Sequence, residues 1–271
     1  MEEEAVGFWL RVFKTVFKGV PKVAKKFSKN KEPYYYKEYN KKVFIKRNGN
    51  GIIVASLLLW VNNKESTEGI IRTFDISDAK EGTKFPDFDT LLENGEKMDL
   101  REKTPFEDYG LWCWSEGDIV TDIIKKYDKI DKPRKNDPRF LSFKMILNKA
   151  ALEKNKSYRI TYALSVPGLY PISNGYFSGT KEDHEKYGSF QTSINTYLSH
   201  DILKYSVYIE KGIVFSEKPQ GYFVDRKKQG ELVPNSCNYK DNMFYEKFDF
   251  TVAKPQIYDK IYMEWDLKNK K

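Results

Sequence analysis

The sequence predicts a mainly β protein, an antiparallel two-sheet β-sandwich preceded by an amphipathic helix. Three observations support this. The chain of 271 residues contains 19 Tyr and 18 Phe, and aromatic side chains favour strands over helices. Apolar and polar residues alternate in many short segments, as in strands with one buried face. Turn residues, and not long helical segments, separate these strands, which is typical of sandwiches.

The first segment, residues 1–29, differs from the rest because its apolar residues recur at three- and four-residue spacing. On a helix, Trp9, Phe13 and Phe17 fall on one face with several aliphatic residues. Seven cations and no acid lie between Arg11 and Lys29. We therefore predict a basic amphipathic helix, kinked near Gly19 and Pro21.

Residues 30–41 show no helical face and include Pro33, so we interpret them as a linker to a β-sandwich domain over 42–271. At its start, Asn48 to Gly51 supply the positive-φ residues of a tight hairpin. After the hairpin, strands are expected at 52–61, 70–76, 111–114, 119–124, 140–147, 158–164, 203–209, 248–252 and 261–267. Loops are expected at 125–139, 173–188 and 229–241.

The segment 203–209 shows the alternation most clearly, with Leu203, Tyr205 and Val207 on one face and the residues between them on the other. Many strands of this kind, without internal repeats, resemble an immunoglobulin-like layout between about residues 42 and 267. This resemblance concerns architecture alone, and a sandwich hosts many unrelated functions.

The positive charge is concentrated at one end of the chain. Residues 1–47 contain 13 Lys/Arg and 5 Glu, an excess of +8, while the remainder contains 34 basic and 34 acidic residues. A nucleic-acid-binding sandwich is therefore not expected, because its surface lacks a basic excess.

The compartment expected from the sequence is the cytoplasm, with possible attachment to the periphery of a membrane. The two cysteines, Cys113 and Cys237, are too few for a disulfide scaffold. The acidic start, Glu2 to Glu4, is unlike a secretory signal, and the longest uncharged apolar run, 51–61, is too short to span a bilayer.

No group of residues predicts a catalytic site, a metal site or a cofactor. The only histidines, His184 and His200, are interpreted as surface loop residues because nothing places them in one cleft. Trp112 and Trp114 share one face of a predicted strand, where they could stack a ligand or fill the core. Cys113 points to the opposite face and is interpreted as a buried thiol.

The favoured hypothesis is a non-catalytic binding or effector protein, attached through the helix to an anionic membrane surface or to a protein partner with an acidic or apolar groove. The residues expected to make this attachment are Trp9, Arg11, Phe13, Lys14, Phe17, Lys18, Lys22, Lys25 and Lys26. Two alternatives stay open. The helix could pack on its own sandwich, or the protein could be an enzyme acting on carbohydrate or another polar substrate in a loop-lined cleft.

Overall fold

The computed structural model describes residues 32–67, 69–75, 91–92, 110–125, 140–178, 190–195, 198–225, 231–235, 237–255 and 260–269. These residues form strands and one 3-10 turn, Glu116–Asp118, and none of them lies in an α-helix. The prediction of a mainly β protein is confirmed. The helix predicted for residues 1–29 lies outside the described residues.

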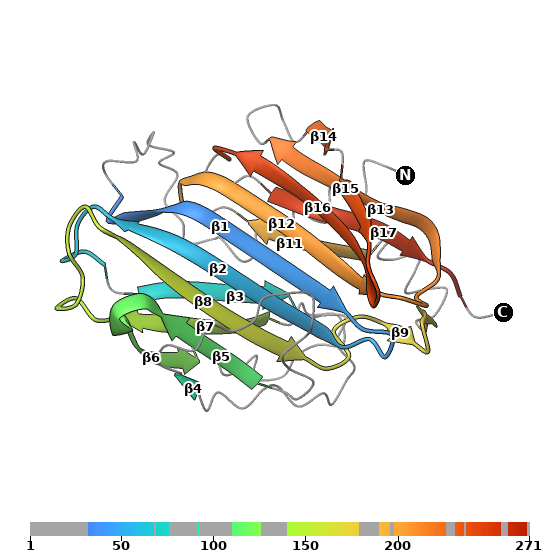
Figure 1. Ribbon diagram of the computed structural model, residues 1–271, viewed down its shortest axis with the longest axis horizontal. Helices are drawn as coiled ribbons and strands as arrows, with labels where there is room; N and C mark the ends of the chain where they lie inside the picture. The colour runs from blue at the N-terminus through green and yellow to red at the C-terminus, as the bar shows by residue number, and fades with distance from the viewer. Residues whose placement is uncertain are drawn as a thin grey trace.

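The largest sheet has eight strands in the order β15-β16-β12-β1-β2-β8-β5-β4 (Figure 1). Their bounds are β1 Tyr34–Ile45, β2 Gly51–Val61, β4 Leu91–Leu92, β5 Gly110–Ser115, β8 Ser157–Val166, β12 His200–Glu210, β15 Asn238–Asp241 and β16 Tyr245–Ala253. Most neighbours are antiparallel, but β1 pairs with β12 in parallel, and so does β4 with β5. The expectation of purely antiparallel sheets is therefore wrong, because alternation along a strand reveals its buried face and not its partner.

Three smaller sheets accompany the large one. The three-stranded sheet has the order β3-β7-β6, with β3 Gly69–Asp75, β6 Val120–Lys125 and β7 Phe140–Leu147. The four-stranded sheet has the order β11-β17-β13-β14, with β11 Phe190–Asn195, β13 Phe215–Asp225, β14 Glu231–Asn235 and β17 Lys260–Leu267. The short strands β9 Ile172–Ser173 and β10 Tyr176–Phe177 form a two-stranded pair.

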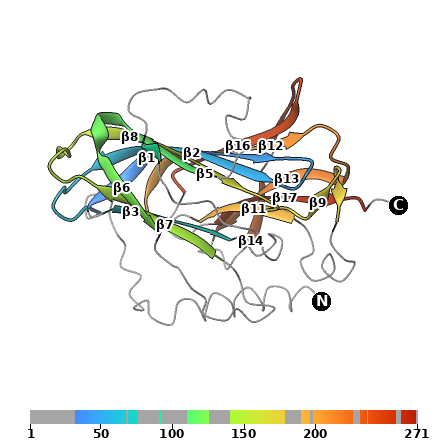
Figure 2. The same ribbon diagram turned by 90° about the horizontal axis from the view of Figure 1, so that it is seen from below.

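The three- and four-stranded sheets lie on the same side of the large sheet, as Figure 2 shows. One continuous apolar cluster contains buried residues of both layers, such as Leu57 of β2, Phe143 of β7 and Met263 of β17. The rings of Phe143 and Tyr162 meet edge to face, with centroids 5.6 Å apart. The main core therefore lies between the large sheet and the smaller sheets, and the large sheet has an inner face and an outer face.

The sheet begins earlier in the chain than predicted. Residues 34–41, interpreted above as part of a linker, belong to β1 and pair with both β2 and β12. The register of β1 against β2 shifts between Tyr36 and Glu38. This irregularity interrupts the two-residue period of the sequence, so the strand was not recognised there.

The predicted hairpin between β1 and β2 is confirmed. Gly49 has a φ of +87°, and its backbone N–H donates to the carbonyl of Lys46 at 2.9 Å. The predicted loops are partly wrong: β10 lies within 173–188, and β14 and β15 lie within 229–241. Pro234 lies in β14, which is an edge strand, where proline is tolerated.

Candidate functional site

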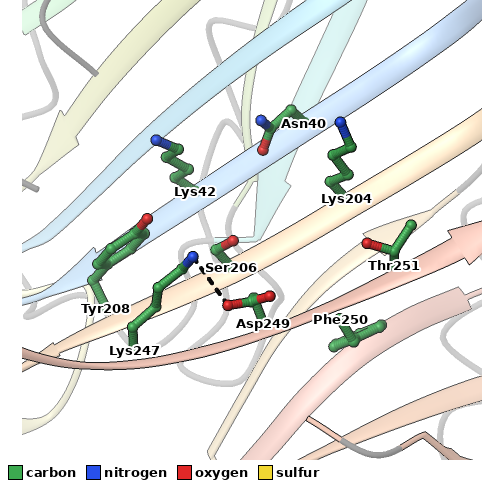
Figure 3. A pocket seen from close by; sticks show the side chains of 9 residues that line it. All are labelled: Asn40, Lys42, Lys204, Ser206, Tyr208, Lys247, Asp249, Phe250 and Thr251. Carbon is green, nitrogen blue, oxygen red and sulfur yellow. Dashed lines mark ion pairs between the residues drawn. The ribbon is translucent and has the colours of Figure 1, made fainter. Parts of the chain in front are cut away.

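A hollow of about 270 Å³ lies on the outer face of the large sheet. Three neighbouring strands form it, β1, β12 and β16, and Figure 3 shows its nine lining residues: Asn40, Lys42, Lys204, Ser206, Tyr208, Lys247, Asp249, Phe250 and Thr251. Ser206 is the common neighbour in the register, opposite Lys42 on one side and Asp249 on the other.

The alternation of β12 explains why these polar side chains gather on one face. Leu203, Tyr205 and Val207 are buried in the main core, as the sequence predicted. Lys204, Ser206 and Tyr208 therefore point to the opposite face. The same alternation in β1 buries Val43 and leaves Lys42 on the hollow side. The alternation of β1 and that of β12 can each be read from the sequence. The parallel pairing that brings the two strands together to form the hollow cannot be read from it.

The lining of the hollow contains three lysines and one aspartate. The ammonium group of Lys247 lies 3.0 Å from a carboxylate oxygen of Asp249. Lys204 donates at 3.0 Å to Glu38, which lies beside the hollow on β1. With Glu38 included, three lysines and two carboxylates lie at the site, a formal excess of one positive charge, which suits a ligand that carries phosphate or carboxylate groups.

Aromatic rings lie directly beside these lysines. The Nζ atoms of Lys42 and Lys247 are 5.9 Å and 5.6 Å from the centre of the Tyr208 ring. Phe44 stacks on Tyr208 with centroids 4.5 Å apart, and Lys46 donates to the hydroxyl of Tyr245 at 2.9 Å. Because cations over ring faces are attracted electrostatically, the rings help to hold the ammonium groups along this face.

These rings belong to a second apolar cluster, which we call the outer cluster. Its buried members are Phe44, Ile52, Val54, Trp112, Ala163, Tyr208 and Tyr245. Trp112 is buried and Trp114 is half-buried against the cluster, so both tryptophans lie on one face of β5. Neither tryptophan lines the hollow.

Cys113 lies on the inner face, between the two tryptophans in sequence. Its Sγ is 3.9 Å from the sulfur of Met145, and burial raises the pKa of the thiol to about 12. A thiol with so high a pKa stays protonated at neutral pH and is a poor nucleophile.

Of the sequence-predicted site residues, only Trp112 and Trp114 fall within the described residues. The nine residues predicted to attach the protein to a membrane or partner, from Trp9 to Lys26, lie outside them, and so does His184.

A polar group inside the main core was missed by the sequence analysis. Arg72 of β3 donates to the hydroxyl of Tyr36 at 2.9 Å, and its guanidinium lies 5.1 Å from the Tyr39 ring. The hydroxyls of Tyr39 and Tyr162 are 3.3 Å apart. His200, expected on a surface loop, is buried in β12 with its ring stacked on Tyr39. We call these five residues the inner polar cluster.

The pKa values of two basic groups at this cluster, Lys41 and His200, are lowered. Burial, followed by the charge of Arg72, lowers the pKa of Lys41 to about 7. The same two causes lower the pKa of His200 to about 4, although its bond to the Leu198 carbonyl acts in the opposite direction. His200 is therefore neutral at pH 7, and its Nδ1 donates to Leu198 at 2.7 Å.

The sequence did contain a signal for these polar residues on the inner face. Lys41 is in phase with Tyr39, Val43 and Ile45, and Arg72 is in phase with Ile70. A basic residue in phase with the apolar face of a strand indicates a polar group facing the core.

No group of three or more His, Cys, Asp or Glu residues that could hold a metal ion occurs in the described parts of the chain. Nor does any helix in those parts have the length and apolarity needed to cross a membrane.

Comparison with known proteins gives little further information. No family model matches the chain, and no curated protein matches it. Among solved structures, the chain is similar to a "putative protease" from Parabacteroides distasonis, with a TM-score of 0.49 and 10% sequence identity. The match covers 85% of this chain and 40% of that one, so this chain spans less than half of that protein's length. A likeness this weak supports no argument about function.

Proposed function

We propose that this protein is a non-catalytic binding protein that attaches to an anionic membrane surface. The main support for the proposal is the distribution of positive charge. The positive excess of the chain lies in residues 1–47, and Lys42 of that segment lines the hollow on the outer face together with Lys204 and Lys247 of other strands. Lys46, one residue after β1, lies 3.7 Å from a carboxylate oxygen of Glu210. The basic N-terminal segment thus leads directly into a lysine-lined hollow. Cations near an anionic bilayer contribute roughly 1 kcal/mol each to binding.

The N-terminal segment would add an apolar contact. In this proposal residues 1–29 form an amphipathic helix in which Trp9, Phe13 and Phe17 enter the bilayer interface and the lysines meet the headgroups. The β layers would form a two-sheet sandwich of immunoglobulin-like layout that carries the helix. The protein would then be cytoplasmic and peripheral to the membrane, where the inner leaflet is negatively charged.

Vesicle sedimentation tests the proposal. The full chain should bind vesicles containing phosphatidylserine more tightly than vesicles of phosphatidylcholine, and the binding should weaken as salt rises because salt screens exposed charges. Changing Lys42, Lys204 and Lys247 to Gln should weaken binding by about tenfold or more. The control carries the same loss of charge on the exposed β7–β8 connection, at Lys149, Lys154 and Lys156, and should bind nearly as well as the native chain.

The helix is tested separately. Changing Lys14, Lys18, Lys22 and Lys25 to Gln should reduce the salt dependence, whereas Trp9→Ala with Phe13→Ala should reduce binding at every salt concentration. If anionic and neutral vesicles are bound equally, or neither is bound, the membrane proposal is wrong. A protein partner with an acidic or apolar groove would then be the better hypothesis.

A further inference from the structure

The end of the β15–β16 hairpin exposes large apolar side chains. Met243 is 81% exposed and Phe244 is 50% exposed, and Tyr239 on β15 is 46% exposed. Among the described residues, six large hydrophobic side chains are exposed, and these three occur together in one hairpin. A cluster of exposed apolar residues on one short element indicates an interaction site more strongly than the same residues scattered over the surface.

Hydrogen bonds fix the conformation of this end. The side-chain oxygen of Asn242 accepts from the backbone N–H groups of Phe244 and Tyr245 at 3.0 and 2.7 Å. The backbone N–H of Lys211 donates to the carbonyl of Phe244, and the Lys211 ammonium pairs with Asp241 at 2.8 Å. The backbone at Met243 and Phe244 is therefore held in place by the structure around it, so little backbone conformational entropy is lost when the two side chains bind a partner.

The turn after β12, which contains Lys211, is itself bonded to neighbouring turns. The N–H of Gly175 donates to the carbonyl of Arg47 at 3.0 Å, and the N–H of Arg47 donates to Glu210 at 2.7 Å. A Cβ atom at Gly175 would overlap the carbonyl oxygen of Gly212. These close contacts join the turns after β1, β9 and β12. The hairpin end packs against the joined turns through Lys211.

The hairpin end projects on the same side as the hollow. In Figure 2 it rises from the large sheet on the side away from the smaller sheets, which is the outer face. The adjacent segments 46–47, 210–211 and 240–247 contain five cations and three acids. The hairpin end is thus a projecting apolar element beside segments with a net positive charge. Such an element suits a bilayer with anionic lipids better than a protein groove, because a groove would need a matching cavity.

We propose that the β15–β16 hairpin end inserts Met243 and Phe244 into the interface of an anionic lipid bilayer while the lysine-lined hollow faces the headgroups. This inference rests on the proposed function and adds the element that enters the membrane. Insertion of the two side chains removes apolar surface from water, a contribution that salt does not screen.

The first test is the double variant Met243→Ser, Phe244→Ser in the full chain. Binding to phosphatidylserine vesicles should weaken by about tenfold or more at every salt concentration, with the salt dependence unchanged. The matched control is Ile71→Ser, Ile124→Ser, which removes two exposed apolar side chains from the three-stranded sheet and should leave binding unchanged. Equal binding of both variants would overturn the inference.

The second test measures insertion directly. Met243→Cys in a Cys237→Ser background is labelled with an environment-sensitive fluorophore, and Cys113 is buried with a raised pKa and should not react. On anionic vesicles the emission should shift to the blue, and quenchers in the acyl chains should reduce it. Bound protein without this shift would overturn the inference and leave the proposed function standing, whereas a chain that does not bind vesicles would overturn both.

Discussion

Arg72 of β3 and Tyr36 of β1 connect the two layers of the protein through a hydrogen bond of 2.9 Å from Nη2 to the tyrosine hydroxyl. The guanidinium also lies 5.2 Å from the centre of the same ring. Because one residue belongs to the three-stranded sheet and the other to the eight-stranded sheet, this contact fixes how the layers face one another.

We predict that Arg72 and Tyr36 are energetically coupled. Charge-assisted hydrogen bonds contribute about 1.5–3 kcal/mol, and loss of either partner leaves the other without this bond. A double-mutant cycle of Arg72→Met and Tyr36→Phe, measured by urea unfolding, should give a coupling free energy of about 1–2 kcal/mol. Additive effects of the two changes would show that the contact does not join the layers energetically.

Lys41 should make stability rise with pH in the mildly alkaline range. Its pKa is about 7 in the folded protein and near 10.5 when unfolded, so the unfolded chain binds more protons between these values. The free energy of unfolding should increase by at most about 1.4 kcal/mol per pH unit from this group. Burial raises the pKa of Tyr36 and Tyr162, which opposes the rise above pH 10, so the measurement covers pH 7–9.

The variant Lys41→Met should abolish this rise and increase stability at pH 7, because it removes a cation from the core. Lys154→Met on an exposed turn is the control and should follow the native pH curve. Parallel curves for the native chain and Lys41→Met would contradict the lowered pKa.

His200 should contribute to loss of stability in acid. Its pKa is about 4 when folded and 6.5 when unfolded, so the unfolded chain takes up the proton first as pH falls from 6.5 to 4. The variant His200→Asn keeps a donor for the Leu198 carbonyl but does not titrate. Unfolding at pH 4.5, 5.5 and 6.5 should show a smaller acid loss for this variant, by at most about 1.4 kcal/mol per pH unit.

Gly175→Ala should destabilise the protein more than Gly117→Ala. Both glycines have positive φ, +84° and +67°, which costs roughly 1–2 kcal/mol for an alanine. Only at Gly175 does the added carbon meet backbone, the carbonyl of Gly212, whereas nothing lies within 4 Å at Gly117. We expect an additional loss of about 1–3 kcal/mol at Gly175, seen as a lower Tm. Equal losses would indicate that the joined turns can move apart.

The sequence predicted the parts of the fold that depend on local pattern. The β1–β2 hairpin and the two faces of β12 were predicted because glycines and alternation mark them directly. The start of β1 was not predicted as a strand, because the register shift between Tyr36 and Glu38 interrupts the alternation that identifies a strand.

The candidate site was less accessible to sequence analysis. Lys42, Ser206 and Asp249 lie on three strands, and nothing in the local pattern says that these strands are neighbours. The hairpin end lies just after the loop predicted for 229–241, and its exposed Met243 and Phe244 become notable only when their surroundings are known. Long-range pairing and exposure are properties of the folded chain, and a single sequence reports them weakly.

The parallel pairing of β1 with β12 has a consequence for synthesis on the ribosome. The β1–β2 hairpin can form soon after it emerges, but the other edge of β1 stays without its partner until the chain has been made as far as Glu210. An open strand edge invites pairing with other nascent chains. We therefore expect truncated chains that end before β12 to aggregate or to recruit chaperones, and the charges of the three lysines of β1, Lys37, Lys41 and Lys42, to oppose such pairing during that interval.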